Sequence, residues 1–224
     1  MSTPVARDSA RRRSHGILAG VTVVGCVLAY AIQPRFPLVL TLTIGLGYLA
    51  LLFLALGLRL RPWQLYRQGR SRNPVNLDLR RAVGIWTGLT GGVHILLGLQ
   101  LYAGGQWLRY FLAFDGTPLL NLFGLSNDLG AAAGLVLAGL LAISNDWSLR
   151  RLRGPRWKAA QRCTYGLFLL VVGHTLGYQN YVVREHVMGY VVAGLVVFVL
   201  AGQGWGIVRH RRARLPAPPL NKAG

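Results

Sequence analysis

Long apolar segments alternate along this chain with short polar connections that are rich in arginine. A helix needs about 20 mostly apolar residues to cross the hydrocarbon core of a bilayer. Six segments meet this requirement, and they predict an all-α, polytopic membrane protein built as a six-transmembrane-helix bundle. The predicted spans are 16–33, 37–58, 82–103, 127–144, 163–182 and 187–208.

The first predicted span is one of the two shortest, and two interpretations of it stay open. It follows three consecutive arginines at 11–13 and ends in Ala29-Tyr30-Ala31, a pattern that resembles a cleavable signal peptide. We favour a retained membrane anchor. The orientation of the other spans is the same under either interpretation.

Lysine and arginine gather in alternate connections, which predicts the orientation of the bundle. Cytoplasmic loops of membrane proteins retain an excess of these residues. All but three of the 25 lysines and arginines fall in the two tails and in the second and fourth loops; the exceptions are Arg35, Arg109 and Arg184. We therefore expect both termini in the cytoplasm, with a basic tail at 1–15, a membrane domain at 16–209 and a flexible tail at 210–224.

The composition agrees with a membrane protein and argues against other classes. Charged residues make up 14% of the chain, whereas a soluble domain carries about 25%. A net charge of +19 suggests a nucleic-acid partner, but the arginines form blocks between apolar runs and match no nucleic-acid motif. Cys26 and Cys163 lie far apart and form no metal or disulfide motif. We expect an integral protein in contact with lipid, in a bacterial cytoplasmic (inner) membrane, without a nucleic-acid partner.

The loop between the third and fourth spans is aromatic and apolar at 107–112, with Gly116 and Pro118 indicating a turn. Tryptophan and tyrosine favour the headgroup level of a membrane, so we expect this loop in the outer interface. The polar run at 126–128 reads as a helix start, because short polar side chains cap free backbone N–H groups. We prefer that capping role for Asp128 over a catalytic one.

Two histidines lie inside apolar spans at matched depth. His94 stands 13 residues beyond Arg81, and His174 stands 12 residues beyond Arg162. At about 1.5 Å per residue, both lie roughly 18–20 Å from the cytoplasmic edge, in the outer half of a core about 30 Å thick. An imidazole at this depth is costly and usually functional. The pair could hold a porphyrin as axial ligands, or each imidazole could simply form a hydrogen bond between helices.

Small residues surround the two histidines. Glycines stand about one turn from each of them: Gly91, Gly98 and Gly177. They would leave a flat slot for a macrocycle, although small residues also let membrane helices pack closely. A ligating imidazole needs an acceptor for its second N–H group, and Thr90, one turn before His94, could supply one.

Several short motifs extend from 79 to 181 in a fixed order. RRAVGIW at 80–86 leads to His94 and is followed by FGL at 123–125, ISNDWSLRRL at 143–152, RWK at 156–158 and QRCTY at 161–165. Their order and spacing resemble the ferric-reductase-like transmembrane domain family, and within it the haem-binding membrane subunits of periplasmic methionine-sulfoxide reductase systems. The resemblance implies a six-helix bundle that binds b-type haem, with a haem-binding core at 79–182. It gives His94 and His174 the axial ligand roles of an outer haem.

The chain departs from the family at the expected inner haem. Gln161 stands where those subunits have a histidine, and Arg80 and Arg81 occupy the region of the second histidine on the third span. We therefore expect one haem b. No segment is long enough for a flavin or nicotinamide domain, so we expect a quinol or another membrane subunit as donor and an outer-face or periplasmic redox protein as acceptor. Arg109 and Arg184 could pair with the haem propionates, since a guanidinium suits a carboxylate, or they could simply be exposed loop arginines, which is the plainer interpretation.

The leading hypothesis is thus a single-haem b-type cytochrome subunit that relays electrons at the outer face, without a catalytic domain of its own. A haem-free structural or assembly subunit of a larger membrane complex is the alternative. A small-solute transporter is disfavoured, because the spans show no paired broken helices and no buried carboxylate.

Overall fold

The computed structural model describes residues 4–68, 77–101, 106–180 and 186–212. These residues form helices joined by short connections and no β-strand, which confirms the all-α prediction. The elements are α1 (Pro4–Ile32), α2 (Leu38–Gln68), α3 (Leu77–Leu101), the 3-10 helix η2 (Trp107–Tyr110), α4 (Leu122–Ala142), α5 (Asp146–Gln161), α6 (Cys163–Tyr178) and α7 (His186–Arg212).

Five helices are long and apolar enough to cross a membrane: α1, α2, α3, α4 and α7. This confirms an integral membrane protein. The remaining predicted span corresponds to α6, which has 16 residues and continues into a π-helical turn at 179–180. The count of six spans and the cytoplasmic position of both termini stay predictions.

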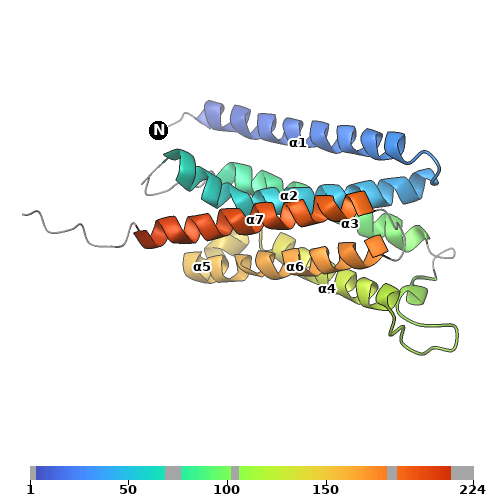
Figure 1. The fold of residues 1–224 in the computed structure, drawn as a ribbon. Helices are drawn as coiled ribbons and strands as arrows, with labels where there is room; N and C mark the ends of the chain where they lie inside the picture. The colour runs from blue at the N-terminus through green and yellow to red at the C-terminus, as the bar shows by residue number, and fades with distance from the viewer. Residues whose placement is uncertain (1–3, 69–76, 102–105, 181–185, 213–224) are drawn as a thin grey trace, which may run out of the picture.

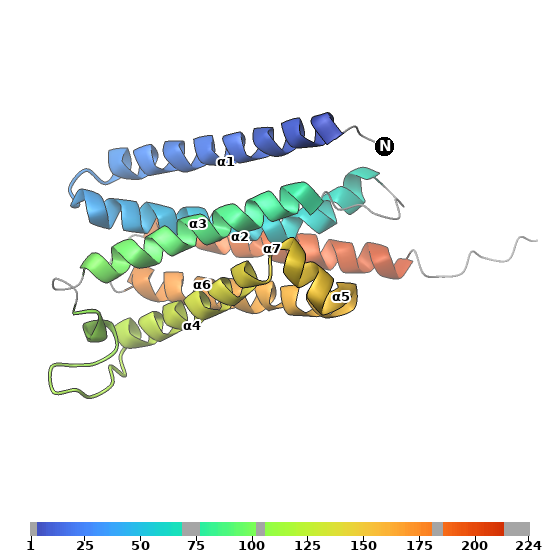
Figure 2. The same cartoon turned by 180° about the vertical axis from the view of Figure 1, so that it is seen from behind.

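The long helices run side by side along one direction, so the bundle has two distinct ends (Figures 1 and 2). At the end that we call the basic end, α1, α3 and α6 begin and α2, α4 and α7 end. The opposite end, which we call the loop end, carries η2 and the connection that follows it. Because the helices share one direction, residues on different helices can be compared by their distance from either end of the bundle.

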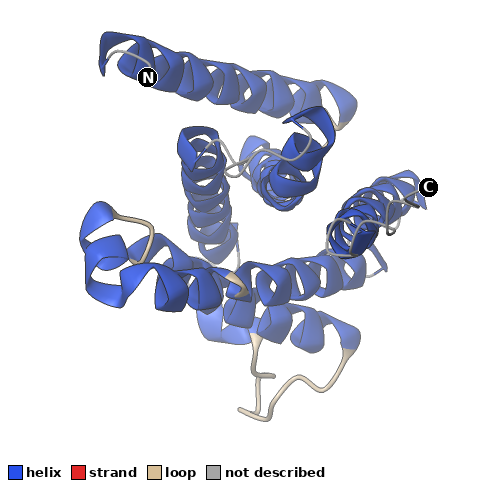
Figure 3. Ribbon diagram, turned by 90° about the vertical axis from the view of Figure 1, so that its left-hand side faces the viewer, coloured by secondary structure: helices blue, strands red, loops and turns tan. Residues whose placement is uncertain are grey.

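Helix α2 is the centre of the packing. It packs most extensively against α3 and also contacts α1, α6 and α7, while α4 packs mainly on α6. Viewed along the bundle, α1 lies at the edge, and it contacts α2 and α3 (Figure 3). Buried side chains join α2 to α4, α6 and α7 in one cluster, which includes Leu51, Leu54, Ala133, Leu167, Phe168 and Val192. The space between α2, α3, α4 and α6 is where the histidines lie.

Helix α4 begins at Leu122 rather than at 127, so the predicted start of this span was wrong. Asn121 is the capping residue, and its side-chain oxygen accepts the backbone N–H of Gly124 at 2.9 Å. Asp128 therefore lies inside the helix and does not cap it. Both Asn121 and the run at 126–128 are good capping sequences, and the apolar residues between them extend the helix to the earlier one.

Helix α5 was not predicted, because its segment was interpreted as a basic loop. Asn145 caps it, accepting the backbone N–H of Ser148 at 2.7 Å. The Trp157 indole donates to the carbonyl of Ile143 at 3.0 Å and ties the helix to the end of α4. Arginine and lysine are good helix formers, so a basic segment folds as a helix once a cap and an anchor are present.

The connection at the loop end contains the predicted turn. Leu112 and Pro118 pair in an isolated antiparallel bridge, and Gly116 between them has a φ of 83°, which favours glycine. The backbone N–H and the hydroxyl of Thr117 donate to one carboxylate oxygen of Asp115 at 3.0 and 2.7 Å. The backbone hydrogen bond, the larger effect, holds the pKa of Asp115 below its ordinary value.

Candidate functional site

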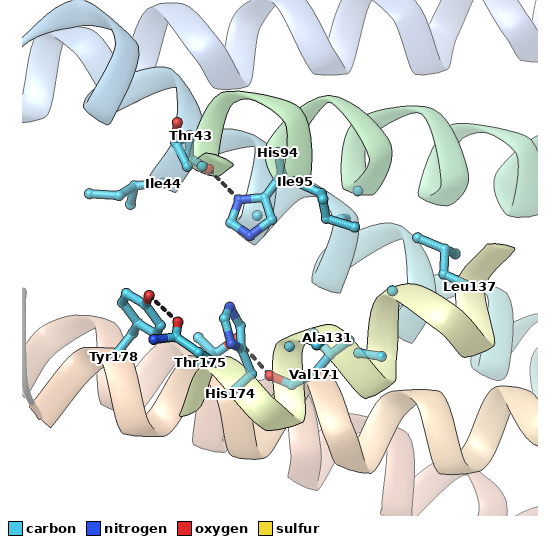
Figure 4. Close-up of a pocket in the computed structure, with 18 of the residues that line it drawn as sticks. Thr43, Ile44, His94, Ile95, Ala131, Leu137, Val171, His174, Thr175 and Tyr178 are labelled. Carbon is cyan, nitrogen blue, oxygen red and sulfur yellow. Dashed lines mark hydrogen bonds between the residues drawn. The ribbon is translucent and has the colours of Figure 1, made fainter. Parts of the chain in front are cut away.

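The two histidines predicted at matched depth face each other across the bundle. His94 projects from α3 and His174 from α6, and their ring centroids are 6.1 Å apart with the ring planes at 81° (Figure 4). One nitrogen of each ring points toward the other ring, while the second nitrogen is turned to a neighbouring helix. The structure therefore brings together two residues that are separated by 80 positions in the sequence.

The His94 ring is held by α2. Its Nδ1 lies 2.7 Å from the backbone oxygen of Thr43. Gly47, one helical turn later, leaves the room that the ring occupies: a Cβ atom at that position would lie 3.0 Å from the imidazole. The carbonyl can only accept a hydrogen bond, so it is Nδ1 that donates.

The His174 ring is held by α4 in the same way. Its Nδ1 lies 2.8 Å from the backbone oxygen of Ser126, and a Cβ atom at Gly130 would lie 2.6 Å from the ring. Each half of the pair thus consists of an imidazole, a carbonyl, and a glycine four residues after that carbonyl. A neutral imidazole with its proton on Nδ1 keeps its lone pair on Nε2, and in both rings Nε2 is the nitrogen that faces the partner.

A cavity of about 510 Å³ opens between the four helices that carry these groups. This volume falls within the range of about 300–1,000 Å³ that is typical of small-molecule sites. The described residues that line the cavity include no charged side chain, and most are aliphatic or glycine; among them are Ile44, Leu54, Ile95, Leu99, Ala131, Gly134, Leu137, Leu167 and Val171. Such surroundings favour neutral imidazoles, because burying an unpaired charge is costly.

Aromatic and amide groups close the cavity toward the loop end. The Tyr178 ring lies 4.9 Å from the His174 ring, Phe123 lies 5.9 Å from Tyr178, and Tyr110 stacks on Phe123 at 6.0 Å. Asn127 accepts the Tyr178 hydroxyl and donates to the carbonyl of Tyr110 at 2.8 Å, while the Tyr110 hydroxyl donates to the carbonyl of Gly98. This network joins η2, α3, α4 and α6 around one edge of the cavity.

The predicted slot residues have different positions in the structure. Gly91 and Gly98 line the cavity, as the slot hypothesis requires. Gly177 is buried but lies outside the lining, and a Cβ atom there would overlap the Ser126 side chain. It allows α6 to approach α4 closely, which is the rival role of a small residue in membrane helices.

Thr90 is not the acceptor for His94. Its hydroxyl donates to the carbonyl of Trp86 at 2.7 Å within the same helix, and it lies outside the cavity lining. The acceptor is the Thr43 carbonyl on the neighbouring helix. A threonine inside a helix commonly donates its hydroxyl to a carbonyl on the preceding turn. The proton on Nδ1 of His94 is already donated to the Thr43 carbonyl, so it is not shared with Thr90.

Arg109 does not reach the cavity. Arg109 donates to the carbonyl of Ala113 at 2.6 Å and stacks on the Phe114 ring, 4.4 Å from its centroid. It therefore stabilises the loop after η2 and is not among the residues that line the cavity. Arg184 lies outside the described residues.

The carbonyls of Thr43 and Ser126 and the glycines Gly47 and Gly130 are site groups that the sequence analysis missed. A backbone carbonyl leaves no signal in a sequence. The two glycines can be read in the sequence, but their contact with the histidines can be recognised only when it is known which helices lie next to each other.

Nearer the basic end, the polar groups have another organisation. Arg59 stacks on the Phe198 ring at 4.4 Å, and Gln203 donates to the carbonyl of Leu58 at 2.7 Å. Arg80 is half-buried, and the side-chain nitrogen of Gln161 is buried without a hydrogen-bond partner in the described structure. This layer presents no facing pair of imidazoles among its described side chains.

His15 is the remaining histidine whose side chain the structure describes. Its Nδ1 accepts a hydrogen bond from the Trp86 indole at 3.1 Å, between α1 and α3. An imidazole that accepts at Nδ1 carries its proton on Nε2, so in this arrangement it has no lone pair left for a metal.

Comparison with known proteins identifies the family of the chain. The family described as ferric reductase like transmembrane component matches residues 42–172, which is more than half of the chain; the match includes His94 and ends two residues before His174. The match confirms the resemblance inferred from the motifs. No solved structure matches the chain.

Individual relatives point in the same direction. The chain is 29% identical over 103 residues to the protein-methionine-sulfoxide reductase heme-binding subunit MsrQ of Bordetella pertussis, covering 45% of each protein. It is 29% identical over 142 residues to the same subunit of Azospira oryzae, covering 63% of this chain and 56% of the relative. It is also 28% identical over 163 residues to the magnetosome protein MamZ of Magnetospirillum gryphiswaldense, covering 69% of this chain and 22% of the relative. The chain thus spans about half the length of the MsrQ relatives that it matches.

Proposed function

We propose that this chain, which belongs to the ferric reductase like transmembrane component family, is a membrane-embedded b-type cytochrome subunit. One haem lies between His94 and His174 and relays electrons to a redox partner at the outer face of the membrane. The observation that carries the proposal is the facing pair itself, with each Nδ1 bonded to a carbonyl and each Nε2 turned toward the other ring.

The separation of the rings supports two axial ligands on one metal ion. A bond from a metal to an imidazole nitrogen is about 2.0–2.1 Å, and that nitrogen lies about 1.1 Å from its ring centroid, so two opposed ligands have centroids roughly 6.3 Å apart. The observed separation is 6.1 Å. The carbonyls of Thr43 and Ser126 supply the second hydrogen bond that orients a ligating imidazole and raises its basicity.

The cavity supports a flat apolar occupant. Its aliphatic lining suits a porphyrin face, and Gly91 and Gly98 beside His94 leave the ring surface free of bulky side chains. The protein holds such a cofactor by ligation, packing and hydrogen bonds, while the cofactor supplies the one-electron chemistry.

The polar groups near the basic end, which we call the basic layer (Arg59, Arg80, Gln161 and Gln203), support the prediction that the chain binds one haem and not two. A second haem would need another facing pair of imidazoles, and the described side chains near Gln161 and Arg80 include none. The buried nitrogen of Gln161 is a hydrogen-bond donor, and the guanidinium of Arg80 stays protonated in proteins, so neither nitrogen can ligate a metal.

The arrangement also suggests where electrons enter and leave. If the loop end faces outward, as the arginine distribution predicts, the histidines lie in the outer half of a bacterial inner membrane. The neighbouring rings of Tyr178, Phe123 and Tyr110 then lead from the cavity toward the outer surface. The donor is a quinol or another membrane subunit. The acceptor is an outer-face redox protein, for which the names of the MsrQ relatives suggest a methionine-sulfoxide reductase.

A reduced-minus-oxidised visible spectrum of the purified protein tests the proposal. We expect the bands of a six-coordinate, low-spin b-type haem, and their loss in His94→Ala and in His174→Ala. His15→Ala is the matched control, because it removes a histidine outside the cavity and should leave the bands in place. A colourless protein that inserts fully into the membrane would support the alternative, a haem-free structural subunit.

A further inference from the structure

Gln179 is a buried amide that lines the histidine cavity without a hydrogen-bond partner. It follows the last residue of α6, and only 6% of its surface is exposed. Neither its side-chain oxygen nor its side-chain nitrogen has a partner in the described structure. Because burying an unpaired amide is costly, such a group in a native protein calls for an occupant that satisfies it.

Its position places the amide on the cavity wall, toward the loop end. Val171, Thr175 and Gln179 follow each other at four-residue intervals and all three line the cavity, so they form one row along α6. Gln179 lies five residues beyond His174, which corresponds to about 7.5 Å along the helix axis. The amide is therefore offset from the imidazole by about one and a half helical turns.

The other polar side chains around the cavity already have partners. The hydroxyls of Thr43, Thr87 and Thr175 donate to carbonyls in their own helices at 2.7–2.9 Å. The Tyr178 hydroxyl donates to Asn127, Asn127 donates to the backbone carbonyl of Tyr110, and the Tyr110 hydroxyl donates to the carbonyl of Gly98. Tyr48 also has an interaction partner. Gln179 differs from all of these.

We propose that the side-chain N–H of Gln179 donates a hydrogen bond to a propionate of the bound haem. The inference rests on the proposed function, because it takes the haem to lie between the two imidazoles. A porphyrin perpendicular to the line that joins the imidazoles extends along the helix axes, so one of its edges points toward the loop end. The lining toward the basic end is aliphatic, with Leu54, Leu137 and Leu167.

Charge explains why this amide matters. No described lining residue is charged, and the guanidinium of Arg109 is engaged with Ala113 and Phe114. A carboxylate at the cavity edge is then stabilised by neutral donors. Because reduction adds a negative charge to the haem, a donor near the propionate favours the reduced form, so loss of this N–H should lower the midpoint potential.

The test compares ordinary haem with haem whose propionates are methyl esters. The full-length protein is prepared without haem in detergent, and each porphyrin is titrated into wild type, Gln179→Met and Asn180→Leu. Methionine matches the length of glutamine without its N–H. Asn180 is the matched control, because it is exposed and its side chain bonds the carbonyl of Leu176 on its own helix.

We expect Gln179→Met to bind haem about ten- to a hundredfold more weakly than wild type, as for the loss of a hydrogen bond to a charged group. The two proteins should bind the dimethyl ester equally, and Asn180→Leu should match wild type throughout. An equal loss with both porphyrins, or no loss with either, would overturn the inference.

Spectroelectrochemistry gives a second, independent readout. The midpoint potential should fall from wild type to Gln179→Met and fall further in Gln179→Glu, which adds a carboxylate in place of the donor. Equal potentials in the three proteins contradict the propionate contact. If the variants His94→Ala and His174→Ala still bind haem as wild type does, the proposed function fails. If both variants lose haem but the Gln179 variants behave like wild type, only this inference fails.

Discussion

The histidine layer and the basic layer are both polar interruptions of an apolar bundle, yet they are built differently. In the histidine layer, each imidazole has a carbonyl on one nitrogen and a facing imidazole beyond the other. In the basic layer, Arg59 stacks on an aromatic ring, and the Gln161 nitrogen is buried without a described partner. The comparison shows that a metal-ligand site is recognised by side-chain nitrogens whose free lone pairs face each other, and not by the number of polar groups in a layer.

The largest expected difference between the two layers appears when one polar side chain is removed from each of them. We expect His174→Ala to lose nearly all bound haem, because a remaining single imidazole cannot form the six-coordinate complex. Gln161→Ala should retain the wild-type haem content, since this amide faces no ligand partner. Pyridine haemochrome content per chain measures both; a loss of haem in Gln161→Ala would show that the basic layer also holds cofactor.

A smaller effect is expected at the glycines that support the imidazoles. Gly130→Ala places a Cβ atom 2.6 Å from the His174 ring, and Gly47→Ala places one 3.0 Å from the His94 ring. Each ring must turn from its preferred position, which should weaken haem binding roughly two- to tenfold, more for Gly130 than for Gly47.

Gly139→Ala is the matched control for that pair. It lies on α4, like Gly130, and an added Cβ atom there meets nothing within 4 Å. Its haem affinity in a titration should equal that of wild type. If Gly139→Ala and Gly130→Ala weaken binding to the same degree, the effect belongs to the helix and not to the contact with the imidazole.

The smallest effect is expected from Thr90→Val. The sequence suggests Thr90 as an acceptor for His94, through its hydroxyl or its carbonyl, whereas in the structure its hydroxyl donates to a carbonyl of its own helix. Valine has a similar shape, so haem affinity should change by less than about twofold. A larger loss of haem affinity, together with a shifted haem absorption maximum, would show that the Thr90 hydroxyl does interact with His94.

The matched depth of His94 and His174 was predictable, because arginines fix the ends of helices and the rise per residue is constant. The all-α membrane fold and the family could be predicted from apolar length and motif order in the same way. The start of α4, the existence of α5 and the acceptor for His94 could not. They depend on which of two possible capping residues begins a helix and on which helices lie next to each other. Both are decided by packing between segments that are distant in the sequence.

Electron paramagnetic resonance of the ferric protein, with spins counted against chains, tests the central claim most directly. Imidazole planes near 81° act almost equally on the two iron orbitals that they overlap, which leaves those orbitals close in energy and the g tensor strongly anisotropic. We expect one such low-spin signal, about one spin per chain, that disappears in both His94→Ala and His174→Ala. A high-spin signal, or two distinct low-spin signals, would contradict a single haem between these two histidines.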